Sequence, residues 1–228
     1  GYIWAILEPV AGVMLLTFIF SLTFFSPPIG TNFALFYASG LLPFFTYSDI
    51  TTKIAQSLRF SKALLSYPRV TFLDAIIGRL LLNAMTQAMV TFVLFALIIK
   101  VYALDVILDI PTMVVSFAMA VSLATGIGMV NCYLFTFYPS WQFAWAVVNR
   151  PLVIVSCVLF VYDTVPEPYR DWLWWNPLVH VVGEMRKGVY PTYDGAYVSP
   201  AYVFGVSGLL ALAGLLLLRR YHRDIANA

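Results

Sequence analysis

The chain has 228 residues, of which 61% are hydrophobic and only 11% are charged. Soluble domains carry roughly 25% charged residues, so this composition excludes an ordinary water-soluble fold and indicates that lipid surrounds much of the chain. The net charge of +2 does not indicate a nucleic-acid partner, and the two cysteines and two histidines lack the spacing of a metal site.

Six apolar runs follow one another along the chain, each long enough, or nearly so, to cross a bilayer. About 20 residues rising ~1.5 Å each span the ~30 Å hydrocarbon core. Only helices satisfy the backbone of such runs in lipid, since the runs do not alternate as barrel strands do. The sequence predicts an all-α polytopic membrane protein with six transmembrane helices. The predicted spans are residues 3–25, 33–50, 75–99, 112–137, 143–162 and 198–218.

The distribution of basic residues predicts that both termini are cytoplasmic. Basic side chains gather between the second and third spans and after the sixth, whereas those on the other side are mixed with acidic ones. The positive-inside rule therefore fixes the orientation, and an even number of spans agrees with it. The basic residues on the predicted cytoplasmic side are Lys53, Arg59, Lys62, Arg69, Arg79, Arg219, Arg220 and Arg223.

Two connections within this single predicted transmembrane domain, residues 1–228, are too long to be turns. The cytoplasmic one, about residues 53–74, has the pattern of a short amphipathic helix. The external one, about residues 163–197, is rich in Trp, Tyr and Pro. Its apolar centre PLVHVV is too short to span, which predicts short re-entrant helices before the last span. The chain opens in mid-pattern without Met, so we expect a preceding segment.

Several motifs occur in an order that resembles one family. They are GYIWAILEP, ASGLLPF, ALLSYPRVTFLDAIIGRLL, SLATGIGM, RPLVIVSCVLF and WNPLVHVV. Together they resemble the membrane subunits of polysaccharide-exporting ABC transporters, and most closely the capsule polysaccharide exporters of Gram-negative bacteria. The chain departs from the pattern after His180, where Gly183 precedes the acidic residue Glu184.

The resemblance implies a homodimer of six-span subunits in the bacterial inner membrane, with a channel between them for a lipid-linked, anionic capsular polysaccharide. It also implies two copies of a separate ABC ATPase subunit, an N-terminal interface helix, and periplasmic co-polymerase-type and outer-membrane export proteins as further partners. The chain has no G-x-x-x-x-G-K-[ST] motif. We therefore expect a transport subunit without catalytic residues or a cofactor of its own, with ATP and Mg on the partner ATPase.

Arg150 and several aromatic residues are the candidates for the channel. An arginine inside a span needs water, an anion or a partner, so Arg150 either faces the channel and attracts the chain or its lipid phosphate, or snorkels to the headgroups. Sugar rings stack on aromatic side chains, although belts at the membrane interface explain most aromatics. The aromatic channel candidates are Phe44, Phe45, Tyr47, Trp172, Trp174 and Trp175.

The predicted ATPase contact consists of Arg59, Lys62, Tyr67, Pro68 and Arg69 in the cytoplasmic connection. The alternative is a membrane-surface helix with solvated charges.

Glu8 lies in the first turns of the first span, where an unpaired carboxylate is costly. It is predicted to form an intramembrane ion pair with Arg79 or with Lys53. Such a pair either anchors the helix or helps to transmit motion from the ATPase.

Glycines inside the spans are predicted to let helices approach closely. They are Gly126, Gly128, Gly205, Gly208 and Gly214.

Two alternative functions remain at this point. One is an ABC-type exporter of O-antigen, teichoic acid, lipid or drug. The other is an integral membrane enzyme, which would need paired carboxylates or a histidine–acid site in one aqueous pocket.

Overall fold

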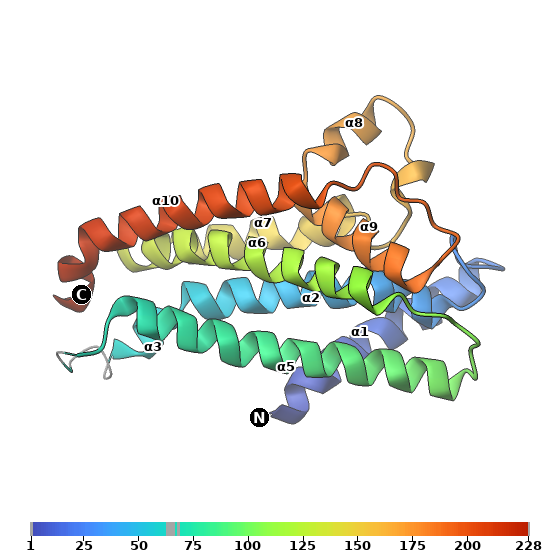
Figure 1. Cartoon of the computed structure of the whole chain (residues 1–228), viewed down its shortest axis with the longest axis horizontal. Coiled ribbons are helices and arrows are strands. Elements are labelled where there is room, and N and C mark those ends of the chain that lie inside the picture. The colour runs from blue at the N-terminus through green and yellow to red at the C-terminus, as the bar shows by residue number, and fades with distance from the viewer. Residues whose placement is uncertain (1, 63–66, 68, 228) are drawn as a thin grey trace.

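A computed structural model describes residues 2–62, 67 and 69–227, and within these residues it contains helices and no strand (Figure 1). The all-helical prediction is therefore confirmed. In chain order, the α-helices are α1 (Tyr2–Thr23), α2 (Phe33–Ala55), α3 (Ser57–Phe60), α5 (Phe72–Val101), α6 (Ile110–Phe137), α7 (Trp141–Val155), α8 (Tyr169–Trp174), α9 (Pro177–Val189) and α10 (Pro200–Asn227), with a 3₁₀ turn, η1 (Tyr162–Thr164), before α8.

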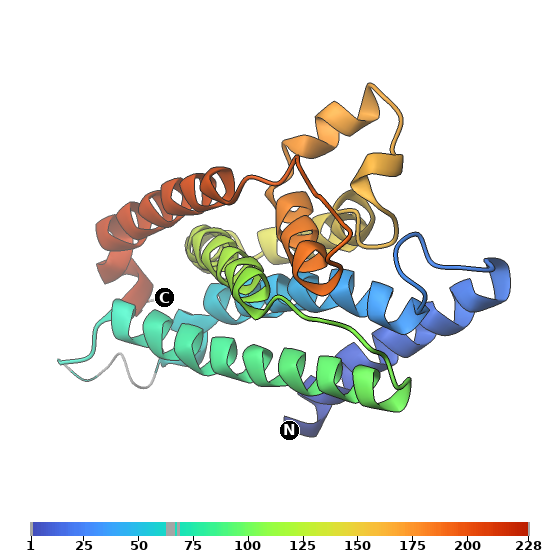
Figure 2. The ribbon, with the colours of Figure 1, turned by 45° about the vertical axis from the view of Figure 1, so that its right-hand side comes forward.

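The long helices α2, α5, α6 and α10 run along the length of the molecule, and α1 crosses them at a slant (Figure 1). This bundle has two distinct ends. At the end that we call the α3 end, α2 stops, α5 begins and the C-terminus lies. At the other end, called the α9 end, α1 stops, α2 begins, and α9 packs against α2 and α6 while α8 projects away from the bundle (Figures 1 and 2).

Four of the described helices are long and apolar enough to cross a membrane. They are α1 from Ile6, α5, α6 and α10 as far as Arg220. With 23 residues, α2 extends roughly 35 Å, which is also sufficient in length. The fifth predicted span differs, because α7 has 15 residues, extends roughly 22 Å and ends at Val155 instead of residue 162. The chain leaves the helix at Cys157, whose φ of 57° is incompatible with a right-handed helix.

Helix α6 lies at the centre of the bundle and packs against α10, α2 and α9. Glycines make the closest approaches possible. A Cβ on Gly126 would lie 2.7 Å from the Ser207 carbonyl oxygen, and one on Gly214 would lie 2.7 Å from the Cβ of Met129. Gly128 packs equally closely on Ile54 of α2. The predicted packing role is thus confirmed for these three glycines.

Gly205 and Gly208 do not take part in such packing. A Cβ on either would meet no atom within 4 Å among the described residues, and both positions are exposed. The packing prediction is therefore not confirmed within the single chain at these two positions.

The short helix α9 is almost wholly buried although it follows an exposed segment. It starts with the Asn176 side chain accepting a hydrogen bond from the Leu178 N–H, and with Pro177 in the first turn, where its missing N–H costs nothing. Its 13 residues extend only about 20 Å, so α9 cannot cross a bilayer. It fills the space between α2 and α6 at the α9 end.

Candidate functional site

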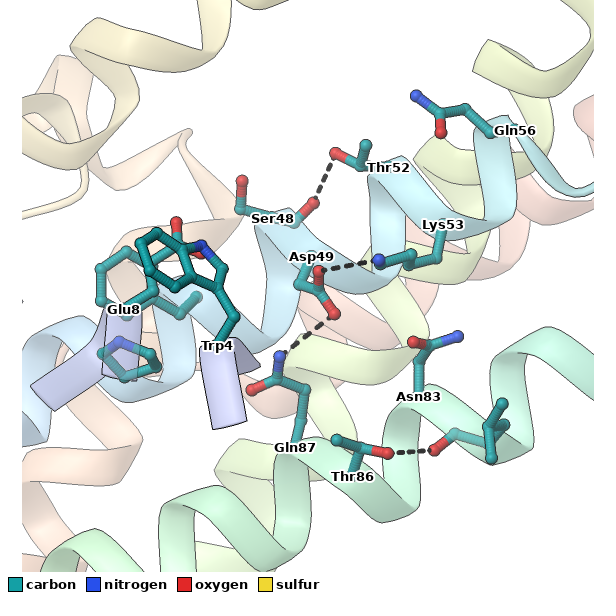
Figure 3. A pocket seen from close by; sticks show the side chains of 13 residues that line it. Trp4, Glu8, Ser48, Asp49, Thr52, Lys53, Gln56, Asn83, Thr86 and Gln87 are labelled. Atoms are coloured by element: carbon teal, nitrogen blue, oxygen red, sulfur yellow. Dashed lines mark hydrogen bonds and ion pairs between the residues drawn. The ribbon is translucent and has the colours of Figure 1, made fainter. Parts of the chain in front are cut away.

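A groove of about 670 Å³ opens between α1, α2 and α5 towards the α3 end (Figure 3). Trp4, Pro9, Phe45 and Leu82 form its apolar walls. We call it the polar groove because the rest of its lining is polar. The polar lining residues are Glu8, Ser48, Asp49, Thr52, Lys53, Gln56, Asn83, Thr86 and Gln87.

Helical spacing brings these side chains together. On α2 they recur at intervals of three and four residues, from Ser48 through Thr52 to Gln56, and so share one face of the helix. On α5, Asn83 and Gln87 follow the same rule. This stripe was visible in the sequence, but the sequence could not indicate that the α2 and α5 stripes face each other.

A small hydrogen-bond network joins the two stripes (Figure 3). The Gln87 amide donates to Oδ2 of Asp49 at 3.1 Å, and the Lys53 ammonium lies 4.0 Å from Oδ1 of the same carboxylate. Gln87 is only 6% exposed and lies midway along α5. Asn83 donates to the Arg79 carbonyl oxygen at 2.7 Å. The groove therefore contains buried and half-exposed polar groups within otherwise apolar helices.

The α9 end has a second polar cluster that the sequence did not reveal. The Arg186 side chain is fully buried, and its guanidinium donates to the carbonyl oxygens of Phe160 and Val158 at 2.8 Å each. It also lies 4.5 Å from the centroid of the Phe36 ring. These two carbonyls belong to the irregular segment after α7, so Arg186 ties that segment to α9 and α2.

His180 makes a similar connection at the start of α9. Its Nδ1 accepts the Ser199 N–H at 3.1 Å, which assigns the proton to Nε2, and Nε2 donates to the Trp174 carbonyl oxygen at 2.8 Å. His180 is therefore neutral here. Burial lowers its pKa below the usual value, because a charged imidazole would lose water contacts.

Comparison with known proteins gives the family. No protein-family model matches the chain. The polysialic acid transport protein KpsM of Escherichia coli is 31% identical over 219 residues, which is 96% of this chain and 85% of the relative. The capsule polysaccharide export inner-membrane proteins CtrC of Neisseria meningitidis serogroup A and BexB of Haemophilus influenzae are 20% and 18% identical, each over 99% of this chain and 85% of the relative.

The chain belongs to the family of capsule polysaccharide export inner-membrane proteins. This confirms the resemblance that the motifs indicated. It also identifies the chain as an inner-membrane transport protein, in agreement with its four long apolar helices. The predicted site residues of this exporter can now be placed in the fold.

Arg150 lies exposed on α7, a helix in which no residue is buried. The neighbouring Asn149 donates to the Ser48 hydroxyl at 2.8 Å and so holds α7 beside α2.

The aromatic candidates on α2 occupy different environments. Phe44 and Tyr47 are 3% and 1% exposed and lie in the core of the single chain. Phe45 lines the polar groove. Only Phe45 therefore faces an open space in this conformation.

The three tryptophans of the predicted external segment also differ from one another. Trp172 and Trp175 are 80% and 69% exposed. Trp174 is half-buried, packs edge-on against His180 and donates through its indole N–H to the Tyr197 carbonyl oxygen at 3.2 Å. Trp174 thus holds α8 against α9, whereas the other two rings are available for contacts.

The predicted ATPase-contact residues Arg59, Lys62, Tyr67 and Arg69 are all exposed at the α3 end. Pro68 lies outside the described residues.

The predicted ion pair of Glu8 does not form in the described part of the chain. Arg79 instead lies 3.8 Å from the centroid of the Phe60 ring, and Lys53 lies near Asp49. The reason is geometric, because α3 covers Arg79 while Glu8 opens into the polar groove.

Proposed function

We propose that the chain is the transmembrane subunit of an ATP-driven exporter that moves a lipid-linked, anionic capsular polysaccharide from the cytoplasm across the inner membrane. The observation that carries the proposal is the 31% identity to a polysialic acid transport protein over 96% of the chain. Similarity to capsule export proteins of two further genera supports a substrate of this class.

The proposed topology has six spans, with both termini and the α3 end in the cytoplasm. In it, α2 is the second span and α7, with the irregular segment that follows it, is the fifth. The excess of basic residues at the α3 end supports this orientation. The shortness of α8 and α9, and the packing of α9 between α2 and α6, support their assignment as re-entrant elements on the periplasmic side.

We propose that two copies of the chain enclose the channel. Helix α7 buries none of its residues within one chain, which leaves its apolar face and Arg150 available at the interface of two copies. Phe44, Phe45, Tyr47, Trp172, Trp174 and Trp175 remain the proposed aromatic contacts of the polymer. Since Phe44 and Tyr47 are buried here, their contact with the polymer requires a second conformation in which these side chains are exposed.

The energy for transport comes from a separate ABC ATPase, two copies of which hold ATP and Mg. Exposed Arg59, Lys62, Tyr67 and Arg69 at the α3 end, together with Pro68, form the proposed contact. Binding of ATP shifts this subunit only as far as the ATPase contacts its two states differently. Periplasmic co-polymerase-type and outer-membrane proteins complete the export path.

Deletion of the gene in its host tests the function. We expect a strain without surface polysaccharide in which polymer of normal size accumulates in the cytoplasm, as measured by surface staining and cell fractionation. The wild-type gene restores the coat, and Arg150→Gln restores it less well than the control Lys100→Gln, which changes an exposed basic residue at the end of α5, outside the proposed channel. A normal coat on the deletion strain would contradict the proposal.

A further inference from the structure

We propose that the polar groove binds a neutral, hydroxyl-rich group, such as a sugar unit, at the cytoplasmic entrance. This inference rests on the proposed function for its biological substrate. The groove shares Phe45 with the proposed channel residues, but the rest of its lining on α1, α2 and α5 includes none of them.

Polar side chains within membrane helices are expensive, and where they occur they mark functional sites by default. Gln87 lies midway along α5, which is one of the helices able to cross the membrane. A purely structural link between α2 and α5 would need only the Gln87–Asp49 bond. The groove has polar lining on three helices, which exceeds that need.

The groove retains unused hydrogen-bonding capacity. An amide side chain offers two N–H donors and a carbonyl acceptor, and an ionised carboxylate accepts about four bonds. Gln87 donates one N–H to Asp49, and Asn83 donates one N–H to the Arg79 carbonyl oxygen. The remaining donors and acceptors of these side chains, with the carboxylate of Glu8, suit hydroxyl groups, which both donate and accept.

The charges in the groove favour an uncharged ligand. Two carboxylates, Glu8 and Asp49, face one ammonium, Lys53, and Asp49 lies 4.0 Å from it. An anionic phosphate or carboxylate would meet a groove that is acidic on balance. The described residues also hold no cluster of three or more His, Cys, Asp and Glu side chains that suits a metal ion. The lining therefore favours an uncharged polyol.

Size and shape agree with this ligand. Small-molecule sites have volumes of about 300–1,000 Å³, and the groove has about 670 Å³. The exposed Trp4 indole and the Phe45 ring stand in its wall and offer flat apolar surfaces to the C–H face of a sugar ring. Hydroxyl groups of this kind come either from uncharged sugar units of the polymer or from a membrane lipid with an uncharged polyol headgroup.

Photocrosslinking in the capsule-producing host tests the proposal. A photoreactive amino acid replaces Asn83 in the groove or, as a matched control, Met85, which lies on the same helix and is 72% exposed. Adducts are detected with a capsule-specific antibody and by mass spectrometry of the purified protein. Each position is tested in cells with polymer synthesis on and in cells with polymer synthesis off.

A capsule adduct at position 83 in producing cells alone identifies the polymer as the ligand. An adduct with a polyol lipid at position 83 in both kinds of cell identifies a headgroup. Either result supports hydroxyl recognition when position 85 gives a lower yield. Equal yields at the two positions, or no adduct at position 83, would overturn the proposal. The deletion phenotype described above does not depend on this outcome. If the groove binds no hydroxyl-rich ligand, the proposed export function is unaffected.

Substitutions supply a second readout. Asp49→Leu and Gln87→Leu, combined with the probe at position 83, should each lower the adduct yield roughly two- to tenfold, the effect of one lost hydrogen bond. Gln142→Leu removes an amide from α7 outside the groove and should leave the yield unchanged. In Asp49→Asn, the amide oxygen can still accept the hydrogen bond from Gln87, so we expect this variant to keep the fold. If Asp49→Leu is purified as a single species with an unchanged yield, the groove does not bind the ligand.

Discussion

The two ends of the bundle treat polar residues in opposite ways. At the α9 end, Arg186 and His180 are buried, and all their side-chain nitrogens except Nε of Arg186 are bonded to the backbone of neighbouring segments. At the α3 end, Asp49 and Lys53 keep 37% and 44% of their side-chain surface exposed in an open groove. Polar groups that make their hydrogen bonds within the chain stabilise one structure. Polar groups that are exposed in a groove are available to a ligand. The comparison predicts stability effects at the α9 end and functional effects at the α3 end.

Arg186→Met should give the largest loss of stability among the predicted effects. The substitution leaves the Phe160 and Val158 carbonyl oxygens without their donors, and each buried unsatisfied group costs about 1–3 kcal/mol. We expect the free energy of unfolding to fall by about 2–5 kcal/mol. Thermal unfolding of the protein in detergent measures this. Arg170→Met, which removes a half-exposed ion pair to Glu167, should change stability by less than about 1 kcal/mol. Equal effects of the two variants would refute the role assigned to Arg186.

Substitutions at the close contact between α6 and α10, which we call the seam, should have the next largest effect on stability. Gly214→Ala places a methyl group 2.7 Å from the Met129 Cβ and 2.9 Å from its carbonyl carbon, so we expect a loss of about 1–3 kcal/mol from overpacking. Gly208→Ala on the same helix meets no atom, and the better helix propensity of alanine should stabilise it by up to about 1 kcal/mol. Melting temperatures of the two variants should therefore move in opposite directions. A shift in the same direction would show that the seam is not tightly packed.

Substitutions at the exposed α3 end should weaken association with the partner ATPase and leave the stability of the chain unchanged. Combined Tyr67→Ala and Arg69→Ala should weaken binding of the partner ATPase about tenfold, or about 1.4 kcal/mol, because Tyr and Arg often dominate such interfaces. Both side chains are exposed, so the fold should be unaffected. Copurification at several salt concentrations measures the effect. Lys100→Ala, an exposed basic residue at the α9 end, is the control and should copurify like the wild type.

His180 should give the smallest effect, a pH dependence of stability. Because burial lowers its pKa below the usual value of about 6.5, the unfolded chain takes up a proton first as the pH falls. Its stabilising contribution is therefore present above about pH 6.5 and is lost as the pH falls towards the lowered pKa, by at most about 1.4 kcal/mol per pH unit. His180→Gln should flatten this slope in melting curves recorded between pH 7.5 and 5.5. An unchanged slope would assign the pH dependence to other groups.

The sequence predicted the membrane helices and the family because long apolar runs and ordered motifs depend only on local residues. It predicted a helix through residue 162, whereas α7 ends at Val155, since the run 143–162 remains apolar after Cys157, where the backbone turns. It did not reveal the buried position of Arg186, because that position depends on carbonyl oxygens more than 25 residues away in the sequence. It proposed Arg79 as a partner of Glu8, whereas the tertiary structure places Phe60 against Arg79.

For the same reason, the sequence reveals the polar stripes that line the candidate groove but not the contact between them. Helical spacing reveals a polar stripe on α2 and another on α5, but the bond between Asp49 and Gln87 joins residues 38 positions apart. Such a contact follows from how the helices pack and not from either stripe alone.

Transport in inverted inner-membrane vesicles tests whether this chain exports capsular polysaccharide. Vesicles that contain this chain and its partner ATPase are supplied with labelled capsular polysaccharide, and polymer protected from an added glycan-degrading enzyme is measured. The account predicts that protected polymer rises with ATP and only in vesicles that contain the chain. Equal protection without ATP, or without the chain, would contradict the assignment as an exporter of capsular polysaccharide.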